Sequence, residues 1–252
     1  MPTSATKRQS REFGGTPMSL LAVESLQAGY GASQVLFGIS LAMAEGEVVT
    51  LLGRNGMGKS TTIKCLTGML APSGGSIVLR GKAMAGAPSY KIARAGVGLV
   101  PEGRQVFPTL TVRENLVATA SRVNARDNPW TLPRVFDLFP RLRERANQLA
   151  GKMSGGEQQM VAVGRALMTN PRLLILDEAT EGLAPLIRQE IWNCLAKIKR
   201  EGLSMIVVDK NLKPMLPLAD RHYVLEKGRI AWSGDSAQLL ANQEIIQRYL
   251  SV

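Results

Sequence analysis

Cysteine and histidine are scarce in this chain. Among its 252 residues there are two cysteines, Cys65 and Cys194, and one histidine, His222. The cysteines form no CxxC pair and have no other metal-ligand residues beside them. We therefore expect two small buried side chains in a reducing compartment, not a disulfide or a metal site. We expect His222 to be a structural or surface residue and not a catalyst.

Long apolar runs are absent as well. No stretch reaches the about 18–20 apolar residues that a membrane-spanning helix needs. Residues 1–18 are polar and basic and have no apolar centre, which is typical of a disordered basic tail and not of a secretory signal. The remaining residues, 19–252, are enough for one large α/β domain or a core domain with a smaller subdomain. The hydrophobic content of 45% supports a sizeable core.

Acidic residues are outnumbered by basic ones, 20 against 31, which gives a formal net charge of +11. This charge is compatible with binding to nucleic acid, with binding to an anionic membrane surface, or with solubility alone. Because the basic residues are spread along the chain, solubility with some attraction to a membrane face is the favoured interpretation. The charge does not decide the function.

Glycine, in contrast, is concentrated in an informative segment. Residues 53–61 read Gly-Arg-Asn-Gly-Met-Gly-Lys-Ser-Thr and fit the phosphate-binding pattern Gly-x-x-x-x-Gly-Lys-[Ser/Thr] at every fixed position. A buried strand is predicted over 47–52 and a helix from Ser60 onward, which is the context that the pattern requires. Glycines let the backbone turn and point N–H groups at a polyphosphate, and a helix N-terminus favours an anion. Lys59 can reach the β- and γ-phosphates, and the Ser60 hydroxyl can bind Mg²⁺.

The chain is therefore predicted to bind a nucleoside triphosphate. The binding residues predicted in this loop are Gly53, Arg54, Asn55, Gly56, Met57, Gly58, Lys59, Ser60 and Thr61.

Hydrophobic patterning predicts a mixed sheet. Alternating runs at 21–26 and 34–41 predict antiparallel strands. Continuous apolar runs at 172–177 and 204–209, each ending in Asp, are typical of parallel strands covered on both faces. Other expected elements are strands at 75–81 and 97–100, a helical segment over 111–148 broken by prolines, a hairpin over 223–232, and a final helix from about Ser236 to Leu250.

Two further segments carry candidate chemistry. Asp177 ends an apolar strand and can hold Mg²⁺ through water, and Glu178 follows it, placed to polarise an attacking water. Ser154 is a predicted helix N-cap, with Glu157 completing a capping box. The Ser154-Gly-Gly turn can also serve as an anion cradle for a γ-phosphate.

These segments, in this order, resemble the ATP-binding subunit of ABC transporters across essentially all of residues 20–250. The resemblance implies an α/β fold: a P-loop NTPase core with a mixed, mainly parallel sheet, an antiparallel β subdomain, and an inserted α-helical subdomain at about 104–152. It implies that ATP is the nucleotide and that Tyr30 stacks on adenine, for which its aromatic face is suited. It also implies that Ser154, Gly155, Gly156, Glu157 and Gln158 complete the ATP site of a partner subunit.

Within this family, residues 101–116, 153–160 and 182–185 are similar to the smaller ATPase subunit of branched-chain amino-acid importers. The ATPases of urea-type and other amide importers are close competitors. Such a subunit is expected at the cytoplasmic face of the inner membrane, as a peripheral protein. Its expected partners are two permease subunits, a second ATP-binding subunit, similar or identical, and, indirectly, a periplasmic solute-binding protein, with no nucleic acid.

The chain departs from the general family pattern at four positions. Glu102 replaces a Gln that contacts Mg²⁺ and water, Ala179 replaces a Pro, and Ala184 replaces an Asp. Lys210 replaces a switch His at the γ-phosphate, and it can act there as a point charge or else turn to solvent or to Asp209. The expected catalytic residues are Glu178, Lys210 and Glu102, and the expected Mg²⁺ ligands are Ser60, Asp177 and Glu102.

Three functions are compared. The leading hypothesis is a transport motor in which ATP closes a dimer and hydrolysis reopens it. A non-transport ATPase acting on nucleic acid would use the basic charge, but such proteins usually carry two cassettes or a long coiled coil. An ATP-binding scaffold that hydrolyses poorly is favoured by Lys210 and Ala184 and opposed by Glu178.

Overall fold

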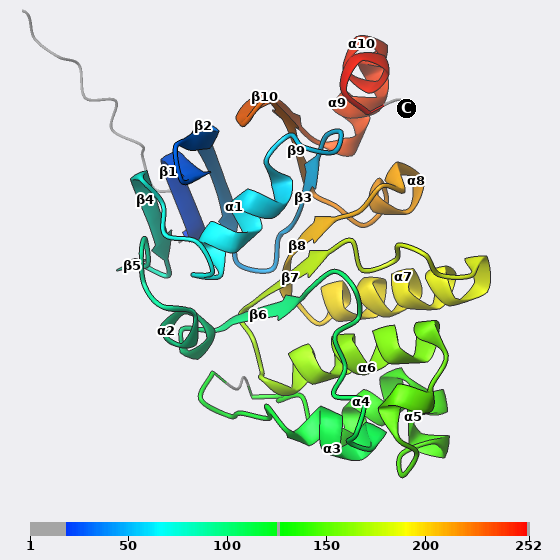
Figure 1. Cartoon of the computed structure of the whole chain (residues 1–252). Coiled ribbons are helices and arrows are strands. Elements are labelled where there is room, and N and C mark those ends of the chain that lie inside the picture. Colours follow the sequence, from blue (N-terminus) through cyan, green and yellow to red (C-terminus); the bar gives the residue numbers. More distant parts are fainter. Residues whose placement is uncertain (1–18, 125–126, 251–252) are drawn as a thin grey trace, which may run out of the picture.

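Two β-sheets form the framework of the protein (Figure 1). The computed structural model describes residues 19–124 and 127–250, so the predicted basic tail lies outside the described residues. The first sheet is antiparallel, with strand order β2-β1-β4-β5. Its strands are β1 (Ser19–Tyr30), β2 (Ser33–Ala44), β4 (Gly74–Leu79) and β5 (Lys82–Ala83).

The second sheet has six strands in the order β10-β9-β3-β8-β7-β6, and only β10 runs antiparallel to its neighbour. This mixed, mainly parallel sheet and its antiparallel companion confirm the predicted fold class. The strands are β3 (Val48–Leu52), β6 (Val97–Val100), β7 (Leu173–Asp177), β8 (Ser204–Val208), β9 (Arg221–Glu226) and β10 (Arg229–Gly234).

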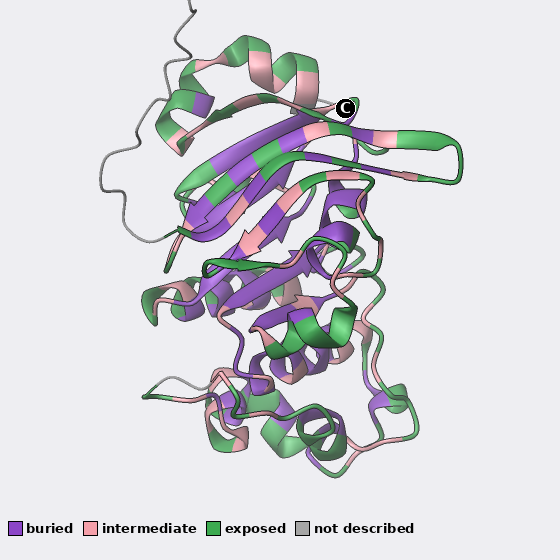
Figure 2. Cartoon of the chain, turned by 90° about the vertical axis from the view of Figure 1, so that its left-hand side faces the viewer, coloured by how far each residue is buried: buried purple, intermediate pink, exposed green. Residues whose placement is uncertain are grey.

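The six-stranded sheet separates two hydrophobic cores. Successive side chains of a strand point to opposite faces. Leu174 and Leu176 of β7 accordingly pack in one core, while Leu173 and Ile175 pack in the other. All five residues of each of β3, β7 and β8 are buried, as Figure 2 also shows. The continuous apolar runs in the sequence therefore correspond to strands that are covered on both faces.

Helices cover both faces of this sheet (Figure 1). The core shared with the antiparallel sheet holds α1 (Lys59–Leu66) and α2 (Ser89–Arg94). The other core packs against α6 (Gly155–Met168) and α7 (Pro185–Arg200). Beyond α6 lie the short elements of the predicted helical segment: α3 (Val112–Val117), α4 (Leu132–Leu138), α5 (Pro140–Glu144) and the 3₁₀ turn η1 (Ala150–Lys152).

The C-terminal part differs from the sequence expectation. The prediction of a single helix from about Ser236 to Leu250 is wrong, because the backbone leaves the helical conformation at Asn242 (φ −106°, ψ 79°). The Asn242 side-chain oxygen accepts a hydrogen bond from Ile245 N and caps a new turn. The segment is α9 (Ser236–Ala241), α10 (Gln243–Ile245) and the π-helical turn η2 (Ile246–Leu250), after α8 (Leu212–Met215).

The scarce residue types are structural in this fold. Cys65 and Cys194 are buried free thiols, and burial raises the pKa of Cys65 to about 11. His222 is fully buried between Thr50 and Ser236. Within residues 19–124 and 127–250, no helix is long and apolar enough to cross a membrane.

Candidate functional site

The phosphate-binding loop connects β3 to α1 at the carboxyl edge of the six-stranded sheet, where ligands of open α/β sheets bind. Its backbone conformation depends on glycine. Gly53 has φ +135°, and a Cβ there would lie 2.4 Å from the Leu225 carbonyl oxygen. Gly58 has φ +102°, and a Cβ there would lie 2.7 Å from Leu36 Cδ2. Any larger residue at either position would distort the loop.

Lys59 is held across this loop. Its Nζ donates to the carbonyl oxygens of Gly53 and Arg54, at 2.7 and 2.9 Å. Only 8% of the residue is exposed. Burial lowers the pKa of Lys59, and the nearby carboxylates of Glu178 and Asp177 oppose this shift. The ammonium group is thus fixed inside the loop before any ligand arrives.

Asp177 and Glu178 stand at the end of β7, beside the loop. Asp177 Oδ1 is buried and has no hydrogen-bond partner among the described residues. Burial and the charge of Glu102 raise the pKa of Asp177. Glu178 has φ +48°, a strained conformation for a non-glycine residue, and its N–H donates to Val208 O on β8 at 2.8 Å. The Glu178 residue lines the hollow beside the loop.

Lys210 follows β8 at the carboxyl edge of the sheet and lies next to Glu178. Its Nζ is 3.4 Å from Glu178 Oε2 and 2.5 Å from Glu181 Oε1. The hydrogen bond to Glu181 and the two negative charges raise the pKa of Lys210. Burial and Glu181 raise the pKa of Glu178 to about 7, against the charge of Lys210. The alternative in which Lys210 pairs with Asp209 is not observed, because Asp209 accepts hydrogen bonds from Thr180 and Asn211 instead.

Glu181 was not among the predicted site residues. Its N–H donates to Glu178 O at 3.2 Å, so the turn after β7 brings the two carboxylates to the same side. The carboxylate oxygens of Glu102, Glu178 and Glu181 lie within 4.8 Å of one another. Its acidic side chain three positions after Glu178 is visible in the sequence, but it matches no position of the motifs considered there.

The loop and the acidic residues enclose a hollow of about 470 Å³. Besides Val35 and Glu181, which the sequence did not suggest, its lining comes from the predicted set. The predicted residues that line it are Asn55, Gly56, Gly58, Lys59, Ser60, Thr61, Glu102, Glu178 and Lys210. Tyr30 is outside this lining and 45% exposed, with Lys64 Nζ 5.4 Å from its ring centroid. Its aromatic ring is therefore accessible on the surface.

The segment Ser154–Gln158 is separate from this hollow and forms the first turn of α6. The predicted capping box is present: Ser154 Oγ accepts from Glu157 N at 3.3 Å, and Ser154 N donates to Glu157 Oε2 at 2.9 Å. Arg145 also pairs with Glu157 at 3.0 Å. Burial acts to raise the pKa of Glu157, but the Ser154 hydrogen bonds and the Arg145 charge outweigh it and lower that pKa.

Arg104 is a second residue that the sequence did not suggest. A Cβ at Gly155 would lie 2.3 Å from Arg104 Nη1, so this guanidinium lies directly against the N-terminal turn of α6. The left-handed backbone of Arg104 (φ +66°) helps to place it there. No sequence pattern identified this contact.

The donor set at the hollow suits Mg²⁺. Magnesium prefers hard oxygen ligands supplied by one or two carboxylates together with substrate phosphates. Asp177 offers a buried oxygen that lacks a partner in the described chain, and Ser60 of the loop offers an exposed hydroxyl that lines the hollow. Glu102 offers a second carboxylate. The residues present fit this ion.

Comparison with known proteins agrees with this geometry. A family model described as ABC transporter matches residues 36–181. The chain belongs to the ABC transporter family of ATP-binding proteins. It is accordingly an ATPase that binds ATP as a subunit of a transporter complex.

Several proteins of this family match the chain over most of their own length. The chain is 45% identical over 231 residues to the high-affinity branched-chain amino acid transport ATP-binding protein BraG of Pseudomonas aeruginosa, covering 92% of this chain and 99% of the relative. It is 31% identical to the probable branched-chain amino acid transport ATP-binding protein LivF of Archaeoglobus fulgidus, covering 89% and 96%. Among solved structures, the ADP conformation of MJ1267, an ATP-binding cassette of an ABC transporter, matches with a TM-score of 0.79 and 26% identity, covering 91% and 98%.

Proposed function

We propose that this chain is the ATP-hydrolysing peripheral subunit of an importer for branched-chain amino acids. The observation that carries the proposal is the 45% identity to BraG over 92% of the chain, together with a phosphate loop and a Glu178 that share one hollow. ATP-binding subunits of urea or amide importers are the nearest alternative, because the same site would serve them.

The loop residues bind the triphosphate. The backbone N–H groups of residues 53–61 cradle the β- and γ-phosphates, and Lys59 neutralises part of their charge. Tyr30 stacks on the adenine ring, which needs only its exposed aromatic face. Ser60, Asp177 and Glu102 would hold Mg²⁺, which would neutralise part of the phosphate charge.

Glu178 and Lys210 act on hydrolysis. The Glu178 carboxylate orients and polarises the attacking water, and the Lys210 ammonium offsets charge that develops on the γ-phosphate. Lys210 first has to exchange its contacts with Glu178 and Glu181 for contacts with the phosphate. Those contacts lie on a side chain that is 51% exposed, so the exchange requires no unpacking of the core.

A second ATP-binding subunit, similar or identical, completes the site. The first turn of α6, Ser154 to Gln158, is proposed to face the γ-phosphate of the ATP bound by the partner. This is supported by the position of the turn outside the chain's own hollow and by its N-terminal backbone N–H groups. Closure of the dimer then moves the helical segment, about 104–152, against two permease subunits at the cytoplasmic face of the membrane.

The test is the assembled transporter. The chain is co-expressed with the permeases and the companion ATPase, and ATP hydrolysis is measured in lipid nanodiscs with the solute-binding protein. We expect several-fold stimulation by leucine, isoleucine or valine and none by urea. Stimulation by urea alone contradicts the substrate class. Recovery of nucleic acid in place of permeases, resistant to moderate salt, contradicts the transport function.

A further inference from the structure

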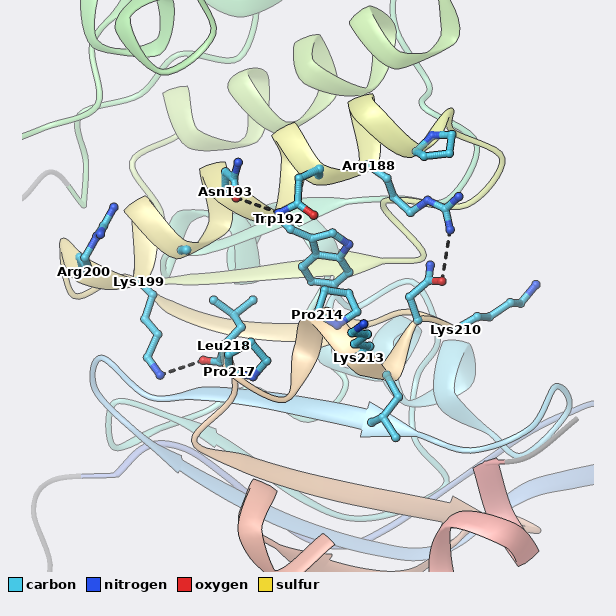
Figure 3. Close-up of a pocket in the computed structure, with 15 residues that line it drawn as sticks. Arg188, Trp192, Asn193, Lys199, Arg200, Lys210, Lys213, Pro214, Pro217 and Leu218 are labelled. Carbon is cyan, nitrogen blue, oxygen red and sulfur yellow. Dashed lines mark hydrogen bonds between the residues drawn. The ribbon is translucent and has the colours of Figure 1, made fainter. Parts of the chain in front are cut away.

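A second hollow lies outside the nucleotide site. A groove of about 1050 Å³ lies between α7 and the segment that holds α8 (Figure 3). One wall is a stripe of α7, from Pro185 to Arg200, and the other consists of residues 210–218. The α7 residues that line it recur at three- and four-residue intervals, so they form one face of the helix.

The floor of this groove is apolar and its rim is basic. Trp192, Pro214 and Leu218 lie along its middle, while basic side chains lie at both ends (Figure 3). None of the described residues that line the groove is Asp or Glu. The basic residues of the lining are Arg188, Lys199, Arg200, Lys210 and Lys213.

Three of these cations are not neutralised within the described chain. Lys199 pairs with Asp220, and Lys210 pairs with Glu178 and Glu181. Arg200 and Lys213, by contrast, make no side-chain hydrogen bond or ion pair with any described residue. Arg188 donates only to the neutral Asn211 side chain, at 3.3 Å.

Two buried donors in the groove wall also lack acceptors. The indole N–H of Trp192, a residue that is 6% exposed, and Nε of Arg188 have no hydrogen-bond partner in the part of the chain that the structure describes. A buried donor without an acceptor is destabilising. Oxygen atoms of an occupant, carboxylate oxygens above all, would offer such acceptors, provided that the two side chains turn slightly toward it.

We propose that this groove binds an extended acidic segment of a partner protein, with an apolar side chain between its carboxylates. Arg188 and Arg200 are twelve positions apart on α7, or about 18 Å at 1.5 Å per residue. An extended peptide covers that distance in about five or six residues at 3.3 Å each. The cations lie at separate ends and do not converge, so they suit an extended chain with two acidic points and not one compact phosphate group.

Charge complementarity excludes the chain's own N-terminal segment as the occupant. Residues 1–18 contain Lys7, Arg8 and Arg11 against the single acid Glu12, so they carry the same sign as the groove. The occupant is therefore a different polypeptide. It would meet Lys210 and Asn211 at the end of the groove nearest the nucleotide site.

The experiment measures peptide binding to the full-length protein by fluorescence anisotropy. The probe is a labelled peptide of about ten residues with two acidic pairs about five residues apart and leucines between them. The variant Arg200→Glu/Lys213→Glu reverses the charge of two of the three cations of the groove that no described carboxylate neutralises. The matched control is Lys82→Glu/Lys91→Glu, which makes the same charge change at exposed positions outside the groove lining. We expect about tenfold or more weakening in the groove variant and less than about twofold in the control.

A second readout uses Trp192 itself. In a Trp130→Phe/Trp232→Phe background, its fluorescence should shift on peptide binding, because those are the other two tryptophans of the chain. Equal weakening in the groove and control variants overturns the proposal, as does equal binding of a peptide whose acidic residues are all adjacent. Vesicles containing phosphatidylglycerol, or inorganic polyphosphate, that displace the peptide and bind more tightly than it does also overturn it. So does self-association of the protein that the groove variant abolishes.

Discussion

The two halves of the nucleotide site are built in different ways. The phosphate loop is fixed by backbone geometry and by a buried Lys59 that carbonyl oxygens hold in place. The opposite side consists of carboxylates and a lysine in ion pairs, with the side chains of Lys210 and Glu181 51% and 44% exposed. Exposed ion pairs contribute about 0–1 kcal/mol and exchange partners readily. We infer that triphosphate binding is preorganised, whereas the arrangement for hydrolysis is adjustable.

The largest expected effect comes from the fixed half. Lys59→Ala should weaken ATP binding by about tenfold or more, because a buried charged hydrogen-bond donor is lost. Turnover should fall by about 10²–10³-fold as well, since the same charge stabilises the transition state. Calorimetric titration and ATPase assays measure both quantities. Lys91→Ala, at an exposed lysine of α2 outside the hollow, is the control, and a similar loss in that variant contradicts a specific role for Lys59.

A smaller and more selective effect is expected from the adjustable half. Lys210→Ala should leave ATP affinity within a few-fold and cut turnover by about tenfold or more, the loss of one charged contact in the transition state. Lys210→His should recover part of the rate. The rates are measured in the complete transporter with transported substrate present. An unaltered rate for Lys210→Ala removes the lysine from the mechanism.

Tyr30 is proposed to bind adenine, but unlike Lys59 its side chain is exposed. Tyr30→Ala should weaken nucleotide affinity by about fivefold, which corresponds to one aromatic stacking contact of about 1 kcal/mol. Saturated turnover should change little. Tyr30→Phe keeps the ring and should restore affinity; failure of the phenylalanine to do so excludes stacking as the cause.

The smallest effect concerns the sheet that supports both halves. Ser236 Oγ donates its hydrogen to Leu216 O, so the same oxygen accepts a hydrogen bond from Nε2–H of His222. Nδ1 of His222 accepts a hydrogen bond from the Thr50 hydroxyl. Burial lowers the pKa of His222 below 6.5 in the folded protein. The unfolded state therefore binds more protons than the folded state as the pH falls below 6.5. The stability that the buried neutral His222 contributes is complete above pH 6.5 and declines as the pH falls toward its folded pKa.

Urea unfolding of the wild type and of His222→Gln at several pH values measures this contribution. The difference in unfolding free energy between the two proteins should shrink as the pH falls below 6.5. A difference that stays constant between neutral and acidic pH contradicts a buried neutral histidine.

The sequence predicted the fixed half better than the adjustable half. The loop pattern and the continuous apolar runs describe contacts within one segment, and the structure confirms the strands that flank them. The meeting of Lys210 with Glu181 instead depends on the register of β7 against β8, in which Asp177 lies opposite Val208. Neither local patterning nor spacing contains that information. The sequence also did not predict the break at Asn242. The residue pattern of this segment is helical, and the break depends on one hydrogen bond that the Asn242 side chain accepts.

The central claim is that the carboxylate half acts on hydrolysis and is not needed for ATP binding, and Glu178→Gln tests it most directly. This substitution keeps the size of the side chain and removes its charge. In the assembled complex, ATP affinity and dimer closure should be retained, while turnover should fall by about 10²-fold or more. A turnover equal to that of the wild type, or a loss of ATP binding as large as that of Lys59→Ala, would contradict the account.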